Sequence, residues 1–119
     1  VEGFAQEADW MRAYSEISDF EEQLARHGAV VIKYWLQIGK DEQHKRFKLR
    51  ERTRHKQFKI TPEDWRNREQ WNAYQVAAAD MIERTSTAHA PWVLVESNDK
   101  YWARVKILQT LVDALRARL

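Results

Sequence analysis

Apolar side chains recur every three or four positions in three stretches of the chain, the spacing that places them along one face of an α-helix. The first stretch covers residues 9–27 and stops at Gly28, a residue type that commonly ends helices. The second covers residues 61–84 and opens with Thr61-Pro62, a helix-starting pair. The third follows Asp99 and carries Val105, Leu108, Leu111, Val112 and Leu115. The pattern predicts three helices, the first with an aromatic stripe that most simply faces a core.

Two shorter segments are rich in β-branched and aromatic residues. Residues 29–38 are apolar on both faces apart from Lys33, and residues 91–95 form the second segment. Runs of this kind are typical of strands buried on both sides of a sheet, usually a parallel one. Together with a further helix between the strands, the order of elements predicts an α/β fold that is mostly helical, with two buried strands and four or more helices.

A sheet of two strands leaves both edges open, and an isolated pair of strands is only marginally stable. Something is therefore expected to complete this sheet. Either further strands lie in sequence not present here, or copies of the chain associate into a homo-oligomer through the open edges.

The further helix is basic and is predicted over residues 42–54, followed by an irregular segment over residues 55–60. Residues 45–59 hold eight Lys or Arg and one Glu, whereas the rest of the chain holds twelve Lys or Arg and seventeen Asp or Glu. The formal charge of +2 thus conceals a basic segment in an acidic body. Such a distribution indicates contact with a polyanion.

Arg46 and Arg50 lie four positions apart on one face of this helix. They are flanked by His44, Lys45 and Arg54. Guanidinium groups can bind phosphate oxygens through two N–H donors at once, so this row suits a chain of phosphates. A merely solvated helix surface is the alternative, but such surfaces usually alternate the sign of their charges.

A second candidate site follows the second strand, where Asn98-Asp99-Lys100 opens a helix. Open parallel sheets bind ligands at this carboxyl edge. Asp99 is equally well explained as a helix cap, whereas Lys100 and Arg104 are placed to reach a phosphate or a nucleotide.

Other chemistry finds little support. No cysteine is present, which excludes disulfides and thiolate metal sites. The four histidines lack metal-ligand spacing, and Glu42, Asp64 and Asp80 show no pairing expected of acid and base groups. We therefore predict neither a catalytic residue nor a metal site within these residues. The three glycines, moreover, do not form the phosphate-cradling loop that nucleotide phosphotransferases of this architecture need, so we expect the chain alone to be unable to complete that reaction.

Length and composition predict one soluble domain over residues 1–119, since 44% of the residues are hydrophobic and 32% are charged. No apolar run approaches the ~20 residues that cross a bilayer. Residues 1–4 lack the features of a signal peptide, so we expect a cytoplasmic protein without membrane contact.

Five blocks of residues, in order, carry a resemblance to a known family. They are Ile17-Ser18-Asp19-Phe20-Glu21; Ile32-Lys33-Tyr34-Trp35-Leu36 with Glu42-Gln43 and Arg46-Phe47; Trp65 with Trp71 and Tyr74; residues 85–92; and Asn98-Asp99-Lys100 with Ala103-Arg104. In these blocks the chain resembles the polyphosphate kinase 2 family, and within it the polyphosphate:AMP phosphotransferases.

This resemblance implies that residues 1–119 are the C-terminal part of a P-loop kinase-like domain of three layers. It implies transfer of phosphate between inorganic polyphosphate and a nucleotide, AMP or ADP, with Mg²⁺ as cofactor. The glycine-rich loop and the acidic Mg²⁺ motif of the family precede the region that matches this chain. The family's basic lid corresponds to residues 42–65, and the phosphate contacts expected from this likeness are Arg46 and Arg50, then Lys56 and Lys59, with Lys45 beside them.

Two other functions compete with a polyphosphate enzyme. A small nucleic-acid-binding module would use the same basic helix on a phosphate backbone. A structural or regulatory domain would need no phosphate loop at all.

Overall fold

The computed structural model describes residues 1–119 and contains five α-helices, one 3₁₀ helix and two strands. Their bounds are α1 Glu7–Arg26, β1 Lys33–Gln37, α2 Lys40–Arg52, η1 Arg54–Lys59, α3 Pro62–Glu69, α4 Trp71–Thr85, β2 Trp92–Glu96 and α5 Lys100–Arg118. The predicted order of helices and strands is confirmed, and the fold is of the α/β type with helix predominating.

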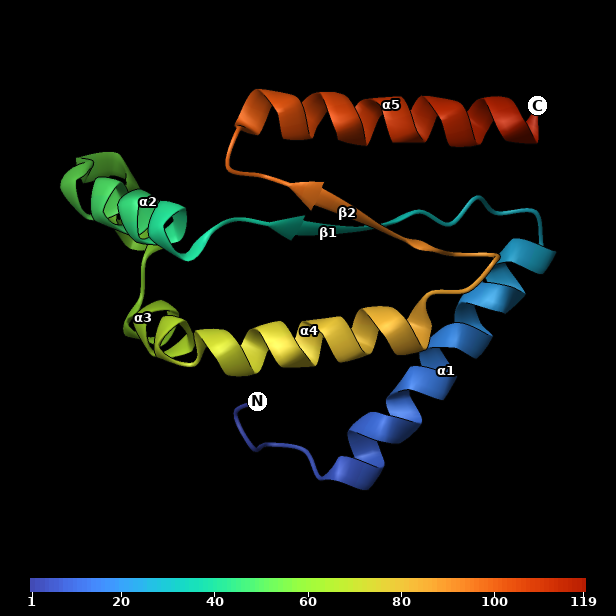
Figure 1. Cartoon of the computed structure of the whole chain (residues 1–119), viewed down its shortest axis with the longest axis horizontal. Coiled ribbons are helices and arrows are strands. Elements are labelled where there is room, and N and C mark those ends of the chain that lie inside the picture. The colour runs from blue at the N-terminus through green and yellow to red at the C-terminus, as the bar shows by residue number, and fades with distance from the viewer.

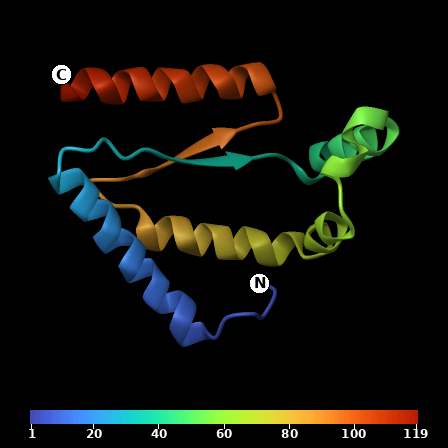
Figure 2. The ribbon, with the colours of Figure 1, turned by 180° about the vertical axis from the view of Figure 1, so that it is seen from behind.

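The two strands pair in parallel, with Lys33 opposite Trp92 and Gln37 opposite Glu96. Consecutive side chains of β1 point to opposite faces of this sheet. The Lys33 ammonium bonds to α1 and to the end of α4, whereas the Tyr34 hydroxyl donates to the carbonyl of Ile107 in α5. The strands therefore form a middle layer between α5 on one face and α1 with α4 on the other (Figures 1 and 2).

Local signals account for the ends of the helices. Gly28, at φ +92, follows α1 and donates its N–H to Ala25, while Ala29 donates to Leu24, the paired bonds of a Schellman motif. Thr61 and Asp64 exchange side-chain and backbone hydrogen bonds in a capping box that opens α3. These positions agree with the starts and stops predicted from sequence.

Three predicted elements were wrong in detail. The single helix over residues 61–84 is two helices separated at Gln70, because α3 packs against α2 while α4 turns to run below the sheet. Residues 54–59 form a 3₁₀ helix and are not irregular. The first strand begins at Lys33 and not at residue 29. Lys33 pairs with Trp92, the first residue of β2, so the residues before Lys33 have no strand residue opposite them.

The prediction that both strands are buried on two sides was also wrong for this chain. Eight of the 119 residues are buried, and Leu36 in β1 and Leu94 in β2 remain more than half exposed. The aromatic stripe of α1 is likewise exposed at Trp10 and Phe20. The reason is geometric: a two-stranded sheet with both edges open offers too little surface to cover the helices packed on it.

The outer face of α5 shows the same lack of cover. Five of the exposed apolar residues of α5 are spaced alternately by four and three positions, the period of a coiled-coil seam. They are Tyr101, Val105, Leu108, Val112 and Leu115. We name this row the α5 seam. None of the helices combines the length with the apolar character required to span a membrane.

Candidate functional site

Both strands point their carboxyl ends toward α2 and α3 (Figures 1 and 2). A cleft of about 760 Å³ lies at this end of the sheet. It is lined by Gln37, Ile38, Gly39, Lys40, Trp71, Gln75, Glu96, Asn98, Asp99, Trp102 and Lys106. Two tryptophans and two lysines thus share one opening with the turn that follows each strand.

The turns after the two strands are tied to each other. The Ser97 N–H donates to the carbonyl of Gln37 at 2.7 Å, which extends the ladder of the sheet by one bond. The Gly39 N–H donates to the side-chain oxygen of Asn98 at 2.8 Å. Asp99 accepts the N–H groups of Tyr101 and Trp102 and so caps α5. Of the two explanations for Asp99, the structure shows the cap.

Arg46 extends this network from the second turn of α2. Its Nη2 donates to the carbonyls of Ser97 at 2.8 Å and Asn98 at 3.0 Å, and its Nε donates to Glu42 at 3.1 Å. The side chain is only 19% exposed. Arg46 therefore spends three of its five N–H donors on the protein itself.

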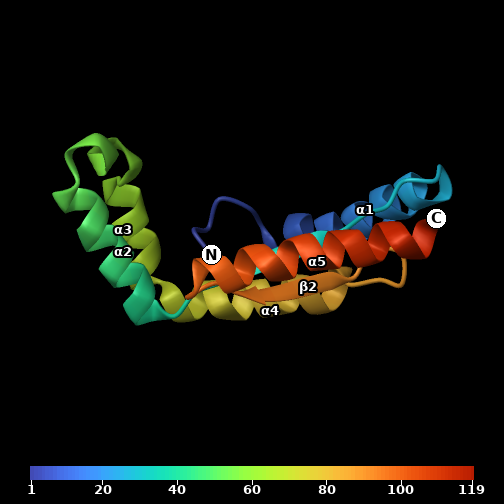
Figure 3. The same ribbon diagram turned by 90° about the horizontal axis from the view of Figure 1, so that it is seen from above.

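The segment from α2 to α3, residues 40–69, projects from the end of the sheet (Figure 3), and we name it the basic arm. It is held together by a small aromatic cluster. Buried Phe47 meets the ring of Trp65 edge to face at 5.2 Å, and His44 meets the same ring at 5.8 Å. Arg68 of α3 donates to the carbonyl of Lys40 at 2.7 Å, which closes the arm near its base.

Most cations of the basic arm lack an acidic partner. Arg46 pairs with Glu42, and Lys48 lies 3.7 Å from Glu51. Along residues 45–59, six cations make neither an ion pair nor a side-chain hydrogen bond: Lys45, Arg50, Arg52, Arg54, Lys56 and Lys59. Fixed positive charges so close together repel one another, and a polyanion relieves that repulsion.

The other two residues of the second candidate site, Lys100 and Arg104, make weaker interactions than the helix cap formed by Asp99. Lys100 is exposed, and the guanidinium of Arg104 lies 5.6 Å from the ring centre of Tyr101. The structure adds Lys106, whose ammonium lies 3.4 Å from Glu96 and 5.0 Å from the ring centre of Trp102. A hydrogen bond from the backbone, with Lys106 as a further cause, lowers the pKa of the Glu96 carboxyl. Glu96 and Lys106 were not predicted, because residues ten positions apart meet here only through the turn between β2 and α5.

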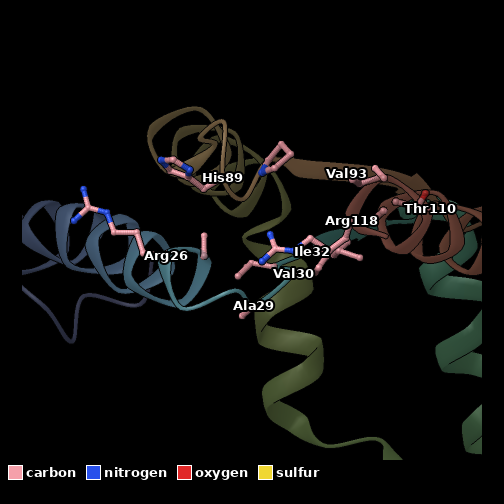
Figure 4. Close-up of a pocket in the computed structure, with 13 residues that line it drawn as sticks. Arg26, Ala29, Val30, Ile32, His89, Val93, Thr110 and Arg118 are labelled. Atoms are coloured by element: carbon pink, nitrogen blue, oxygen red, sulfur yellow. The ribbon is translucent and has the colours of Figure 1, made fainter.

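A second cleft, of about 490 Å³, lies at the opposite, amino end of the strands. Its lining is mainly apolar and comes from the loop before β1, from β2 and from α5. Figure 4 shows Arg118 reaching toward Val30 and Ile32, with Arg26 on the other side, on α1. This cleft has few cations, and it lies far from the basic arm.

The fold and the first cleft thus define an α/β protein that presents a cationic helical arm at the carboxyl end of parallel strands. The family model described as polyphosphate kinase 2 matches residues 1–119, so the chain belongs to the polyphosphate kinase 2 family.

Three relatives show how close the match is. The chain is 58% identical to a polyphosphate:AMP phosphotransferase of Pseudomonas aeruginosa over 98% of its own length and 24% of that protein. It is 36% identical to an ADP-polyphosphate phosphotransferase of the same organism, over 99% of this chain and 39% of that one. A crystal structure of a polyphosphate kinase 2 from Pseudomonas aeruginosa superposes with a TM-score of 0.94 at 58% identity, over 98% of this chain and 25% of that one. The chain therefore spans about a quarter of the length of the first of these relatives.

Proposed function

We propose that this chain is the lid-bearing part of a polyphosphate-dependent nucleotide phosphotransferase with a P-loop kinase-like domain. The observation that carries the proposal is the row of unpaired cations on an arm beside a cleft at the carboxyl ends of parallel strands. In the reaction, a P–O bond of inorganic polyphosphate breaks and a new one forms to a phosphate oxygen of the nucleotide. The higher identity to the relative named for AMP, compared with the one named for ADP, favours AMP as the acceptor.

The role of the basic arm in this proposal is electrostatic. Lys45, Arg50, Lys56 and Lys59 hold phosphate oxygens, whereas Arg46 directs three of its five N–H donors to the protein itself. Positive charges fixed in advance stabilise the charge that spreads over the transferred phosphoryl group, and closure of the arm excludes water. In this proposal Lys100 and Arg104 contact the nucleotide from the start of α5, where Asp99, Trp102 and Lys106 line the cleft.

The family resemblance implies Mg²⁺, which would neutralise phosphate charge during transfer. No three His, Cys, Asp or Glu side chains of this chain come together to hold a metal ion. The residues present therefore do not form a complete Mg²⁺ site, and their proposed role is confined to binding and positioning phosphates.

Polyphosphate binding by the full chain tests this proposal. We expect a dissociation constant that rises steeply with salt. Arg50→Ala with Lys56→Ala should weaken binding. It should also reduce the slope of log Kd against log salt concentration by roughly 0.7–0.9 for each phosphate that the variant no longer neutralises. Arg12→Ala is the matched control, since Arg12 lies on α1 between two acidic partners.

Equal binding by the double variant and the parent chain would contradict the role of the arm. A preference for duplex DNA or RNA over polyphosphate at the same salt concentration would favour a nucleic-acid-binding module instead.

A further inference from the structure

Arg46 and Arg50 are the same residue type on the same face of α2, yet their surroundings differ. Arg46 donates to two backbone carbonyls of the turn between β2 and α5 and to Glu42. The side chain of Arg50, one helical turn further along, makes no hydrogen bond or ion pair. One arginine is fixed to the body of the protein, and the other is free to bind a ligand.

The bonds of Arg46 join two segments that lie 51 and 52 positions apart in sequence. A single nitrogen, Nη2, directs one N–H to Ser97 and one to Asn98, so the plane of the guanidinium is defined by both carbonyls. Because Nε also donates to Glu42, one turn back on α2, the side chain is fixed at its stem as well as at its tip. The bond from Gly39 to Asn98 adds a further tie at the start of the same helix.

We propose that Arg46 is a positioning residue that sets the angle of the basic arm over the strand ends. The proposal rests on the proposed function only in naming what the arm positions, which is a row of phosphate-binding cations. The bonds of Arg46 fix the base of the arm to the turn that carries the cap of α5. Cations further out, from Arg50 onward, then meet the phosphates at a fixed height above the cleft.

Charge and burial both favour this role over direct phosphate binding. Glu42 lies 3.1 Å from Nε and neutralises much of the Arg46 charge. An anion at Arg46 would also have to approach that carboxylate, which repels it. Lysine could not replace Arg46 in this role, because an ammonium is a compact point charge without the planar fork that reaches two carbonyls and a carboxylate at once.

The geometry can be measured on the full chain without any ligand. The chain has no cysteine, so spin labels placed by Glu63→Cys in α3 and Gln109→Cys in α5 report the distance from the arm to the body. We expect a narrow distance distribution in the parent chain and a broad one in both Arg46→Ala and Arg46→Lys. Arg50→Ala should leave the distribution unchanged, and it is therefore the matched control.

Hydrogen exchange gives a second readout. The Gly39 amide bonds to Asn98, in the turn that Arg46 holds, so its exchange rate should rise on the order of tenfold in Arg46→Ala and Arg46→Lys. In polyphosphate titrations, the slope of log Kd against log salt concentration should stay unchanged in Arg46→Lys and should become smaller in Arg50→Ala. If Arg46→Ala folds poorly by circular dichroism, Arg46→Lys decides the matter.

An unchanged distance distribution and unchanged Gly39 exchange in a folded Arg46→Lys variant would overturn the proposal. If Arg46→Ala weakens polyphosphate binding as much as Arg50→Ala does, with no change in the arm, Arg46 is a phosphate ligand and the positioning role is wrong. If the arm loosens but neither variant alters polyphosphate binding, the positioning role stands and the proposed function fails.

Discussion

Lys33 lies in β1 and forms a buried ion pair whose loss should destabilise the whole chain. Its ammonium donates to Glu21 of α1 at 2.9 Å and to the carbonyl of Thr85 at 2.6 Å, and it lies 4.9 Å from the ring centre of Trp92. The two charged side chains are 10% and 11% exposed. One side chain thus joins α1, β1, the end of α4 and β2, so its contacts hold together one face of the sheet.

Substitution of Lys33 by Met leaves the Glu21 carboxylate in the same buried place without its partner. Removal of one member of a buried ion pair costs about 3–5 kcal/mol of unfolding free energy, because the remaining charge is neither hydrated nor compensated. The Thr85 carbonyl loses its donor as well. We therefore expect Lys33→Met to lower the unfolding free energy by about 3 kcal/mol or more. With Glu21→Leu added, most of that stability should return, since an apolar pair of similar volume carries no desolvation penalty.

Urea unfolding followed by circular dichroism measures these differences as shifts of the midpoint at constant slope. The control is Arg12→Ala, which breaks the Arg12–Glu16 pair at 3.2 Å on the surface of α1, where the side chains are 69% and 66% exposed. That pair should contribute about 0–1 kcal/mol. A loss below about 1 kcal/mol for Lys33→Met, no larger than the control, would refute the reasoning, and so would a double variant less stable than Lys33→Met alone.

Three further predictions concern the helices. Gly28→Ala should lower the free energy of unfolding in urea by about 1 kcal/mol or more. The φ of +92 disfavours a residue with a side chain, and the new Cβ would lie 3.2 Å from the Arg118 guanidinium. Equal stability of the variant would contradict this prediction. Partial burial, and then the carboxylate of Asp80, raises the pKa of Tyr14 above its ordinary 10.0, so Asp80→Asn should lower that pKa in an ultraviolet absorbance titration. The folded state holds this proton more tightly, so the contribution of Tyr14 to stability is complete below pH 10.0 and is lost as the pH rises through the folded-state pKa. Because the α5 seam is exposed, we predict that the chain self-associates through it and that Leu108→Lys reduces this association in sedimentation velocity experiments. A parent chain that stays monomeric, or equal association of the variant, would contradict a contact at the seam.

The sequence predicted those features of the fold that depend on neighbouring residues. Gly28 ends α1, Thr61 opens α3 and Asp99 caps α5, each through bonds to residues within five positions. The parallel pairing of the strands also followed from their apolar composition and from the helices between them. These signals are local, and nothing distant in the chain opposes them.

The features that escaped prediction arise from contacts between distant residues. Lys33 stood out only as an interruption of an apolar run, because its partner Glu21 belongs to a helix on one face of the sheet. The break at Gln70 has no glycine or proline to announce it and results from the packing of α3 against α2. Burial of the strands was overestimated. Apolar composition shows that a strand is suited to burial, whereas its actual exposure depends on which neighbouring elements pack against it.

The row of arginines on α2 shows most directly what spacing can and cannot establish. Residues four apart lie on one helical face, and from this Arg46 and Arg50 were assigned the same role. A helix rises 1.5 Å per residue, so Arg50 lies about 6 Å further than Arg46 along the axis of α2, which projects from the end of the sheet (Figure 3). That displacement puts the carbonyls of Ser97 and Asn98 within reach of Arg46, whereas Arg50 makes no such bond. Two side chains with identical chemistry thus acquire different surroundings through their distance from the sheet, and we accordingly propose that Arg46 positions the arm while Arg50 binds phosphate.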